Sequence, residues 1–97
     1  MAAIGVLMLE LQIDHAHSLK DKRNVVRGLK DRLRQRHNIA VAEVGRQDVW
    51  QHALVAAVTV SPERVFAERV LQAVEDDAAG ILGGMLVASS TEWIDAG

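Results

Sequence analysis

A line of cations in the first half of the chain has the spacing of a phosphate-binding surface. Residues 20–36 contain eight basic and two acidic side chains, a local charge of +6, whereas the rest of the chain carries −8. Intervals of three and four residues, which place side chains on one helical face, separate Lys20, Arg23, Arg27, Lys30 and Arg34. These five residues are called the basic stripe below. Such a stripe can contact successive phosphates, and Arg can do so bidentately; the alternative is a solvated face that only keeps the protein soluble.

Few acids accompany the basic stripe. Asp31 and Asn24 lie beside it, and we expect neither to neutralise it. Arg32 and Arg36 are expected on the opposite flank of the same helix, where they widen the positive area. This charge segregation favours binding over a purely solvated face and says nothing about the fold.

Lys22 differs from the other cations because its helical phase points it toward the buried side. We expect its stem to snorkel or its ammonium to pair with a carboxylate such as Asp48 or Glu43, in a structural rather than a catalytic role.

A second polar segment, which also carries an indole, contains Gln47, Asp48 and Trp50. Trp50 could stack on a base or plug the edge of the core, and with a single aromatic there we favour the plug.

The sequence gives only weak indications of metal binding or catalysis. His15 and His17 precede the basic helix, but without a clear third ligand they do not predict a metal site. No glycine-rich phosphate loop with Lys and Ser or Thr is present, and the serines have no visible base partner. We therefore expect no catalytic residues, no metal and no cofactor, and no small-molecule substrate is indicated.

The patterning predicts strands at residues 4–13, 39–44, 53–60 and 85–94. The first helix is predicted at residues 19–37, with Ser18 as N-cap and Asp21 completing a capping box. Ser61 and Pro62 predict the start of a second helix that frays through residues 75–77. The apolar faces of the two helices are predicted to comprise Leu19, Val25, Val26, Leu29 and Leu33 in the first, and Phe66, Val70, Ala73 and Val74 in the second.

The order of these elements predicts an α+β, ferredoxin-like βαββαβ fold, with two helices on one face of a four-stranded antiparallel sheet. Ile4, Val6 and Met8 point to one side of the first strand, and the leucines between them point to the other. A sheet that is apolar on both faces usually has both covered. We expect the open face to be buried in a homodimer or by a partner; the alternative is a mildly apolar face that a monomer tolerates.

The motif SLKDKR at residues 18–23, which includes Ser18, Leu19, Asp21 and Lys22, and the segment QDVWQ at residues 47–51 resemble the YlxP-like family. This is a group of small bacterial proteins described as a domain of unknown function, and the resemblance extends over nearly the whole chain, including the strand at residues 41–44. It implies a ferredoxin-like fold and no particular activity. Genes of this family often lie beside those for translation initiation and ribosome maturation.

Length and composition limit the domain organisation and the cellular compartment that we expect for this chain. The 97 residues include no cysteine, which excludes disulfides and thiolate chemistry and indicates an intracellular protein. The apolar stretch at residues 4–13 is far shorter than the roughly 20 residues that span a bilayer, and it lacks the features of a signal peptide. We expect a single cytoplasmic domain over residues 1–97 with no membrane association. Its expected function is non-catalytic RNA or ribosome binding through the basic helix; the alternative is a homodimeric protein-protein adaptor working through the open sheet face.

Overall fold

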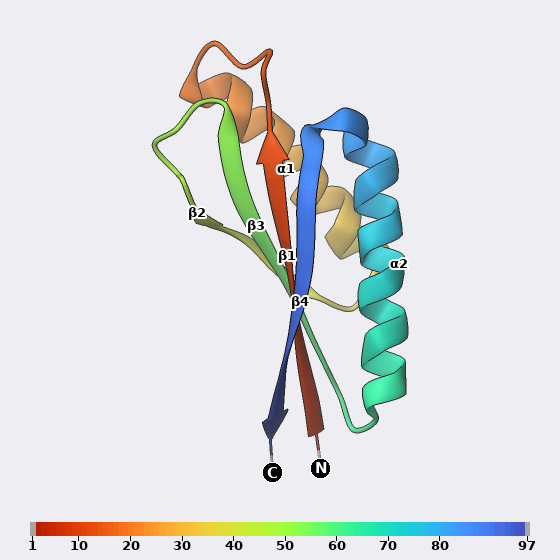
Figure 1. The fold of residues 1–97 in the computed structure, drawn as a ribbon. Helices are drawn as coiled ribbons and strands as arrows, with labels where there is room; N and C mark the ends of the chain where they lie inside the picture. The colour runs from red at the N-terminus through yellow and green to blue at the C-terminus, as the bar shows by residue number, and fades with distance from the viewer. Residues whose placement is uncertain (1, 97) are drawn as a thin grey trace.

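The structure, a computed structural model, describes residues 2–96, and its elements follow the predicted order. They are β1 (Ala2–Gln12), α1 (Leu19–Arg36), β2 (Ala40–Gly45), β3 (His52–Ser61), α2 (Arg64–Leu82), the 3-10 turn η1 (Gly83–Met85) and β4 (Leu86–Ala96). The sheet has the order β2-β3-β1-β4, and each neighbouring pair of strands is antiparallel. Both helices pack on one face of this sheet (Figure 1). The predicted ferredoxin-like fold is confirmed.

Strand β1 lies in the middle of the sheet and alternates between the two faces as predicted. Leu7, Leu9 and Leu11 are buried under the helices, whereas Ile4, Val6 and Met8 are half-buried on the open face. Buried side chains of α1 and α2 complete the core on the helical face; they are Val26, Leu29, Leu33, Leu71, Val74, Ala78 and Leu82. Removing this apolar surface from water is the main force that holds the two layers together.

The start of α1 follows its sequence signature closely. Ser18 is the N-cap, and its Oγ accepts a hydrogen bond from the backbone N–H of Asp21 at 3.1 Å. The carboxylate of Asp21 accepts from the backbone N–H of His17 at 2.9 Å, one residue before the position a capping box usually bonds. The two side chains thus satisfy two backbone donors at the helix end.

The ends of α2 differ from the prediction. The helix begins at Arg64 after Glu63, and Ser61 Oγ accepts from the Glu63 N–H at 3.2 Å, so Ser61 closes a turn before the helix instead of capping it. At the other end α2 continues to Leu82 and does not fray through residues 75–77. Glu75 is held there by Ser89, whose hydroxyl donates to it at 2.6 Å.

The buried face of α2 also differs from the predicted one. Ala67, Leu71 and Val74 are buried, whereas Phe66 is 54% exposed. The helix can approach the sheet closely because β1 carries Gly5 at this point. A Cβ atom at Gly5 would lie 2.6 Å from Leu71 Cδ1, and 2.8 Å from an atom of the Trp93 ring. The absence of a side chain at Gly5 therefore leaves room for Leu71 of α2 and Trp93 of β4.

Adding one methyl group at Gly5 tests this packing. We expect Gly5→Ala to destabilise the protein by about 1–3 kcal/mol, because the methyl group overlaps the buried Leu71 side chain. Gly28→Ala is the matched control: its added Cβ meets no atom within 4 Å, and in α1 it should stabilise by about 0.5–1 kcal/mol. Urea denaturation measures both, and a Gly5→Ala protein as stable as wild type would show that α2 does not pack this closely.

Candidate functional site

Lys22 is the most deeply buried charged side chain among the described residues. Its side chain has no exposed surface, and its Nζ donates to the backbone carbonyls of Arg46, Gln47 and His52 at 2.6, 3.0 and 3.2 Å. These three bonds use all the N–H groups of the ammonium. Glu43 Oε2 lies 2.9 Å from Nζ and supplies the compensating charge without a directed hydrogen bond of its own. The predicted pairing of Lys22 with a carboxylate is confirmed, and the partner is Glu43.

The loop between β2 and β3, residues 46–51, is fixed by these bonds. Arg46 adopts a left-handed backbone conformation (φ 59°), and its carbonyl also accepts from the Val49 N–H at 3.1 Å. At the other end of the loop, Gln51 accepts from the Ile13 N–H at 2.8 Å and its side chain donates to the Asp14 carbonyl at 3.2 Å. The loop is therefore held both by α1 and by the segment that precedes α1.

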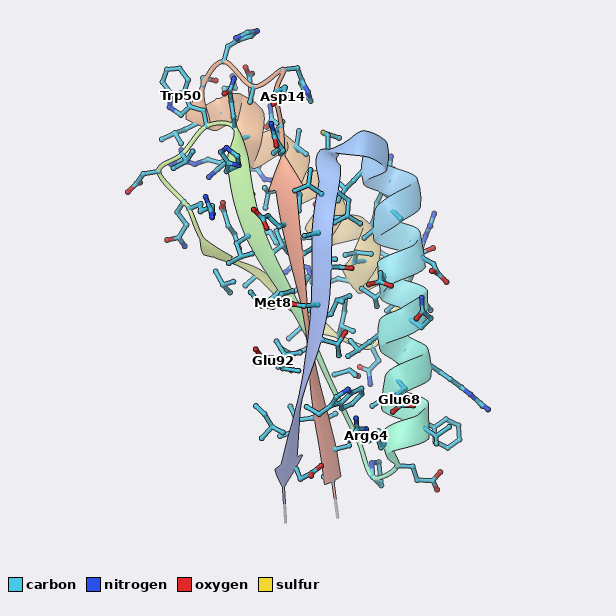
Figure 2. The ribbon with its side chains drawn as sticks, viewed as in Figure 1. Met8, Asp14, Trp50, Arg64, Glu68 and Glu92 are labelled. Carbon is cyan, nitrogen blue, oxygen red and sulfur yellow. The ribbon has the colours of Figure 1, made fainter. Side chains whose placement is uncertain are left out.

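The indole of this loop lies outside the core. Trp50 is 51% exposed, and its neighbours Asp48 and Val49 are exposed as well. Figure 2 shows Trp50 at the end of the molecule where the Asp14 segment also lies. The prediction that Trp50 plugs the edge of the core is wrong, because Ile13 and Ala16 of the preceding segment are buried at this end instead.

Four of the five stripe residues, Lys20, Arg23, Arg27 and Arg34, are exposed, and Lys30 is half-buried. The side chains from Lys20 to Arg34 extend over about 21 Å of helix. The Arg34 guanidinium lies 3.1 Å from the Asp31 carboxylate. Asp31 was expected to neutralise no residue of the stripe, and for Arg34 that expectation is wrong. The other four stripe residues make no ion pair within 4 Å among residues 2–96.

The opposite flank of α1 faces α2 near its C-terminal end. Arg36 lies 3.8 Å from Asp77 of α2, and the imidazole of His37 contacts the same carboxylate. This acid offsets part of the positive area that Arg32 and Arg36 were expected to add. The basic stripe, which lies on the flank away from these contacts, is therefore the less neutralised side of the helix.

On the open face of the sheet the apolar side chains lie mainly on β1 and β3, whereas β4 adds Glu92 to the row of Val6 and Ser90 to the row of Met8. Ile4 pairs across the strands with Val60 and Ile94, Val6 pairs with Val58, and the row of Met8 includes Ala56. On the described part of this face the charged side chains are Glu10 and Glu92, and all eleven Lys and Arg residues of the chain lie outside the strands. The predicted apolar character of both sides of β1 and β3 is confirmed.

A groove between α2 and β4 was not anticipated from the sequence. It encloses about 300 Å³ over a floor of Leu7, Leu71 and Trp93. Arg64 stacks over Trp93, 4.6 Å from the ring centroid. Its guanidinium also donates to Glu68 at 3.1 Å, and Figure 2 shows these two residues together on α2. The groove depends on the separation between a helix and an edge strand, and the periodicity of the sequence does not encode that separation. The two acids that line it, Glu68 and Glu75, are already bonded to Arg64 and Ser89.

Within residues 2–96 no three potential metal ligands of the His, Asp or Glu type come together. His37 contacts Asp77, and His15 and His17 are exposed in the segment before α1. Neither described helix is long and apolar enough to cross a membrane.

Fold and sheet order define a ferredoxin-like α+β protein, and solved structures agree. The chain is similar to the designed protein Foldit4 (TM-score 0.61, 7% identity, 99% of each chain covered). It is also similar to a dimeric ferredoxin-like protein of unknown function from Thermobifida fusca (TM-score 0.59, 16% identity, 98% of this chain and 92% of the other). At these identities the likeness concerns the fold alone.

Sequence comparison then gives the family. Residues 4–87 match the model of the family described as "Protein of unknown function (DUF503)". The chain is 38% identical over 71 residues to the uncharacterized protein YlxP of Bacillus subtilis (strain 168), which covers 73% of this chain and 77% of that protein. The chain belongs to this family, as its motifs predicted, and neither description names an activity.

Replacing Lys22 tests its role in holding the loop. We expect Lys22→Met to cost about 3–5 kcal/mol of unfolding free energy, because it leaves Glu43 without its counter-charge and three carbonyls without a donor. Lys20→Met, an exposed change two residues earlier, should stay within about 0.5 kcal/mol of wild type. Urea denaturation and amide hydrogen exchange of residues 46–51 measure the effect; equal stability of the two variants would contradict the assignment.

Proposed function

We propose that this protein is a non-catalytic RNA-binding module whose phosphate-facing surface is the basic stripe of α1. The observation that carries the proposal is the set of exposed cations Lys20, Arg23 and Arg27, on one flank of a helix and without ion pairs to described residues. Unpaired exposed cations in a line suit a polyanion, because each phosphate contact releases condensed counterions. Among polyanions, the gene neighbourhood implied by the family resemblance favours RNA.

The surroundings of the stripe support the same reading. The strands hold no Lys or Arg, so the positive potential is concentrated on the helical layer. With few aromatic residues in the chain and none on the open sheet face, base recognition by a row of sheet aromatics is not available. We therefore propose that the protein contacts the RNA backbone and recognises its shape. The affinity should depend strongly on salt concentration.

A matched pair of charge reversals tests this surface. Arg27→Glu should weaken binding to structured ribosomal RNA fragments and lower the slope of log affinity against log salt by about 1. Reversing Arg23 as well should lower it by about 2 in total. Arg69→Glu changes the net charge equally on the exposed part of α2 and should leave the slope unchanged. Equal effects of Arg27→Glu and Arg69→Glu would mean that net charge, and not the stripe, governs binding.

The open sheet face supports a second function, a homodimeric adaptor that self-associates through this face. Its most exposed apolar row is Val60, Ile4 and Ile94, and Val60 is 60% exposed. The Thermobifida fusca protein of similar fold is described as dimeric. The occupant we propose is a second copy of the chain, placed sheet against sheet, which would cover the apolar rows of both copies.

The size of the face fits a dimer of moderate strength. The four strands cover about 600 Å² in plan, from a rise of about 3.4 Å per residue and a strand spacing of about 4.8 Å. Stable interfaces commonly bury about 800 Å² on each partner. Nearly the whole face would therefore be used, and the two acids on it, Glu10 and Glu92, would lie within the contact or at its rim.

Charging the exposed row tests the dimer. Val60→Lys with Ile94→Lys should convert a dimer at micromolar concentration into a monomer, because four added charges cannot be buried together without partners. Both side chains are exposed in the protomer, so folding should be retained. Val65→Lys, at a site 56% exposed on α2, is the matched control and should leave the mass unchanged. Sedimentation equilibrium measures the mass, and a monomeric wild type at micromolar concentration would refute the dimer.

A further inference from the structure

A lysine and the tryptophan of the loop that it holds show the reverse of the usual pattern of burial. Lys22 has no exposed side-chain surface, whereas Trp50 of the loop that Lys22 holds is 51% exposed. A large aromatic side chain normally contributes to stability by leaving water. Exposed Val49 next to Trp50 extends the apolar surface. At this end of the molecule the structure therefore retains an apolar surface in solvent that the core does not use.

The loop that carries Trp50 has few degrees of freedom to lose on binding. Its backbone is bound by Lys22 Nζ at Arg46, Gln47 and His52, and by the segment before α1 at Gln51. A side chain on a fixed backbone gives up only its own rotamer entropy when it binds a ligand. An exposed indole on such a loop is a prepared contact surface, because the loop does not first have to be ordered.

The loop lies at the end of the basic stripe. Lys22 reaches the loop carbonyls directly, and Lys20 and Arg23 belong to the same first turns of α1 on its outer side. Arg46, exposed in the loop itself, adds a further cation. An RNA strand that follows the stripe toward the N-terminal end of α1 therefore arrives at the Trp50 loop.

The charges around Trp50 indicate that an RNA base, and not a phosphate, would contact the indole. Asp48 lines the same open hollow of about 570 Å³ as Trp50, and Asp14 lies in the adjoining segment (Figure 2). Carboxylates repel phosphates, whereas the uncharged face of a base can stack on an indole. Gln51 also lines the hollow, and its side-chain amide holds the Asp14 segment beside it through the 3.2 Å bond to the Asp14 carbonyl.

We infer that Trp50 is a stacking platform for an unpaired RNA base, placed where the basic stripe ends. A base within a duplex is already stacked on both faces, so the ligand is a single-stranded loop, bulge or end flanked by a backbone that the stripe contacts. This inference rests on the proposed RNA-binding function and deepens it by naming the class of RNA. It assigns backbone contacts to the cations and base stacking to Trp50.

The test compares two oligoribonucleotides, a hairpin with a single-stranded loop and a fully paired duplex of the same composition. Trp50→Ala should weaken hairpin binding roughly 5- to 150-fold, the range for loss of one base-aromatic stack, and leave duplex binding unchanged. Phe66→Ala, which removes an aromatic of similar exposure from α2, is the matched control and should change neither. Because the chain has two tryptophans, Trp93→Phe isolates Trp50, whose fluorescence the hairpin should quench and the duplex should not.

The outcomes separate the two proposals. If Trp50→Ala binds the hairpin as tightly as wild type while Arg27→Glu weakens binding to both RNAs, the stacking inference is overturned and the basic stripe stands. If the hairpin affinity depends on Trp50 but not on Arg27, the stacking inference holds and the stripe proposal fails. If wild type binds neither RNA at low salt, both are overturned.

Discussion

The burial of one ammonium group determines the arrangement of this end of the molecule. Lys22 faces inward because it occupies the same helical face as Val26, Leu29 and Leu33. Once inside, it must find acceptors for three N–H groups and a counter-charge, since an uncompensated buried charge is strongly destabilising. Two loop carbonyls, the carbonyl of His52 at the start of β3, and Glu43 meet this requirement, so residues 46–51 are bound to α1 although they are more than twenty positions away in the chain.

The two-layer fold keeps the two candidate surfaces apart. The cations lie on the helical layer, and the apolar rows lie on the opposite face of the sheet. A sheet-against-sheet dimer would leave the two α1 helices on its two outer sides. RNA binding by the stripe and self-association by the sheet are therefore sterically compatible, and together they would give a particle with two separate RNA-binding surfaces. The loop with Trp50 lies beyond the ends of β2 and β3, so it would flank this contact.

Much of this arrangement could be predicted from the sequence, and the exceptions have physical causes. Periodicity located the elements, the two-sided apolar strand and the inward direction of Lys22, because each depends only on residue spacing along one element. The buried face of α2 was misplaced because Phe66 is more hydrophobic than Ala67. In the structure Leu71 of α2 packs over Gly5 of β1, and this contact depends on packing between segments that are distant in the sequence. The helix extends past its acidic residues because Ser89 and His37, distant in sequence, contact them.

Trp50 could not be placed from the sequence for a related reason. In a loop no periodicity separates inside from outside, so a single indole is compatible with both a core plug and an exposed contact. The choice is made by competition for the space at the end of the sheet, where Ile13 and Ala16 are fully covered and the Lys22 bonds determine the path of the loop. The buried cation thus stabilises a loop conformation that leaves an aromatic in solvent. The bonds of Lys22 order this loop before any ligand binds, and such pre-organisation lowers the entropic cost of binding.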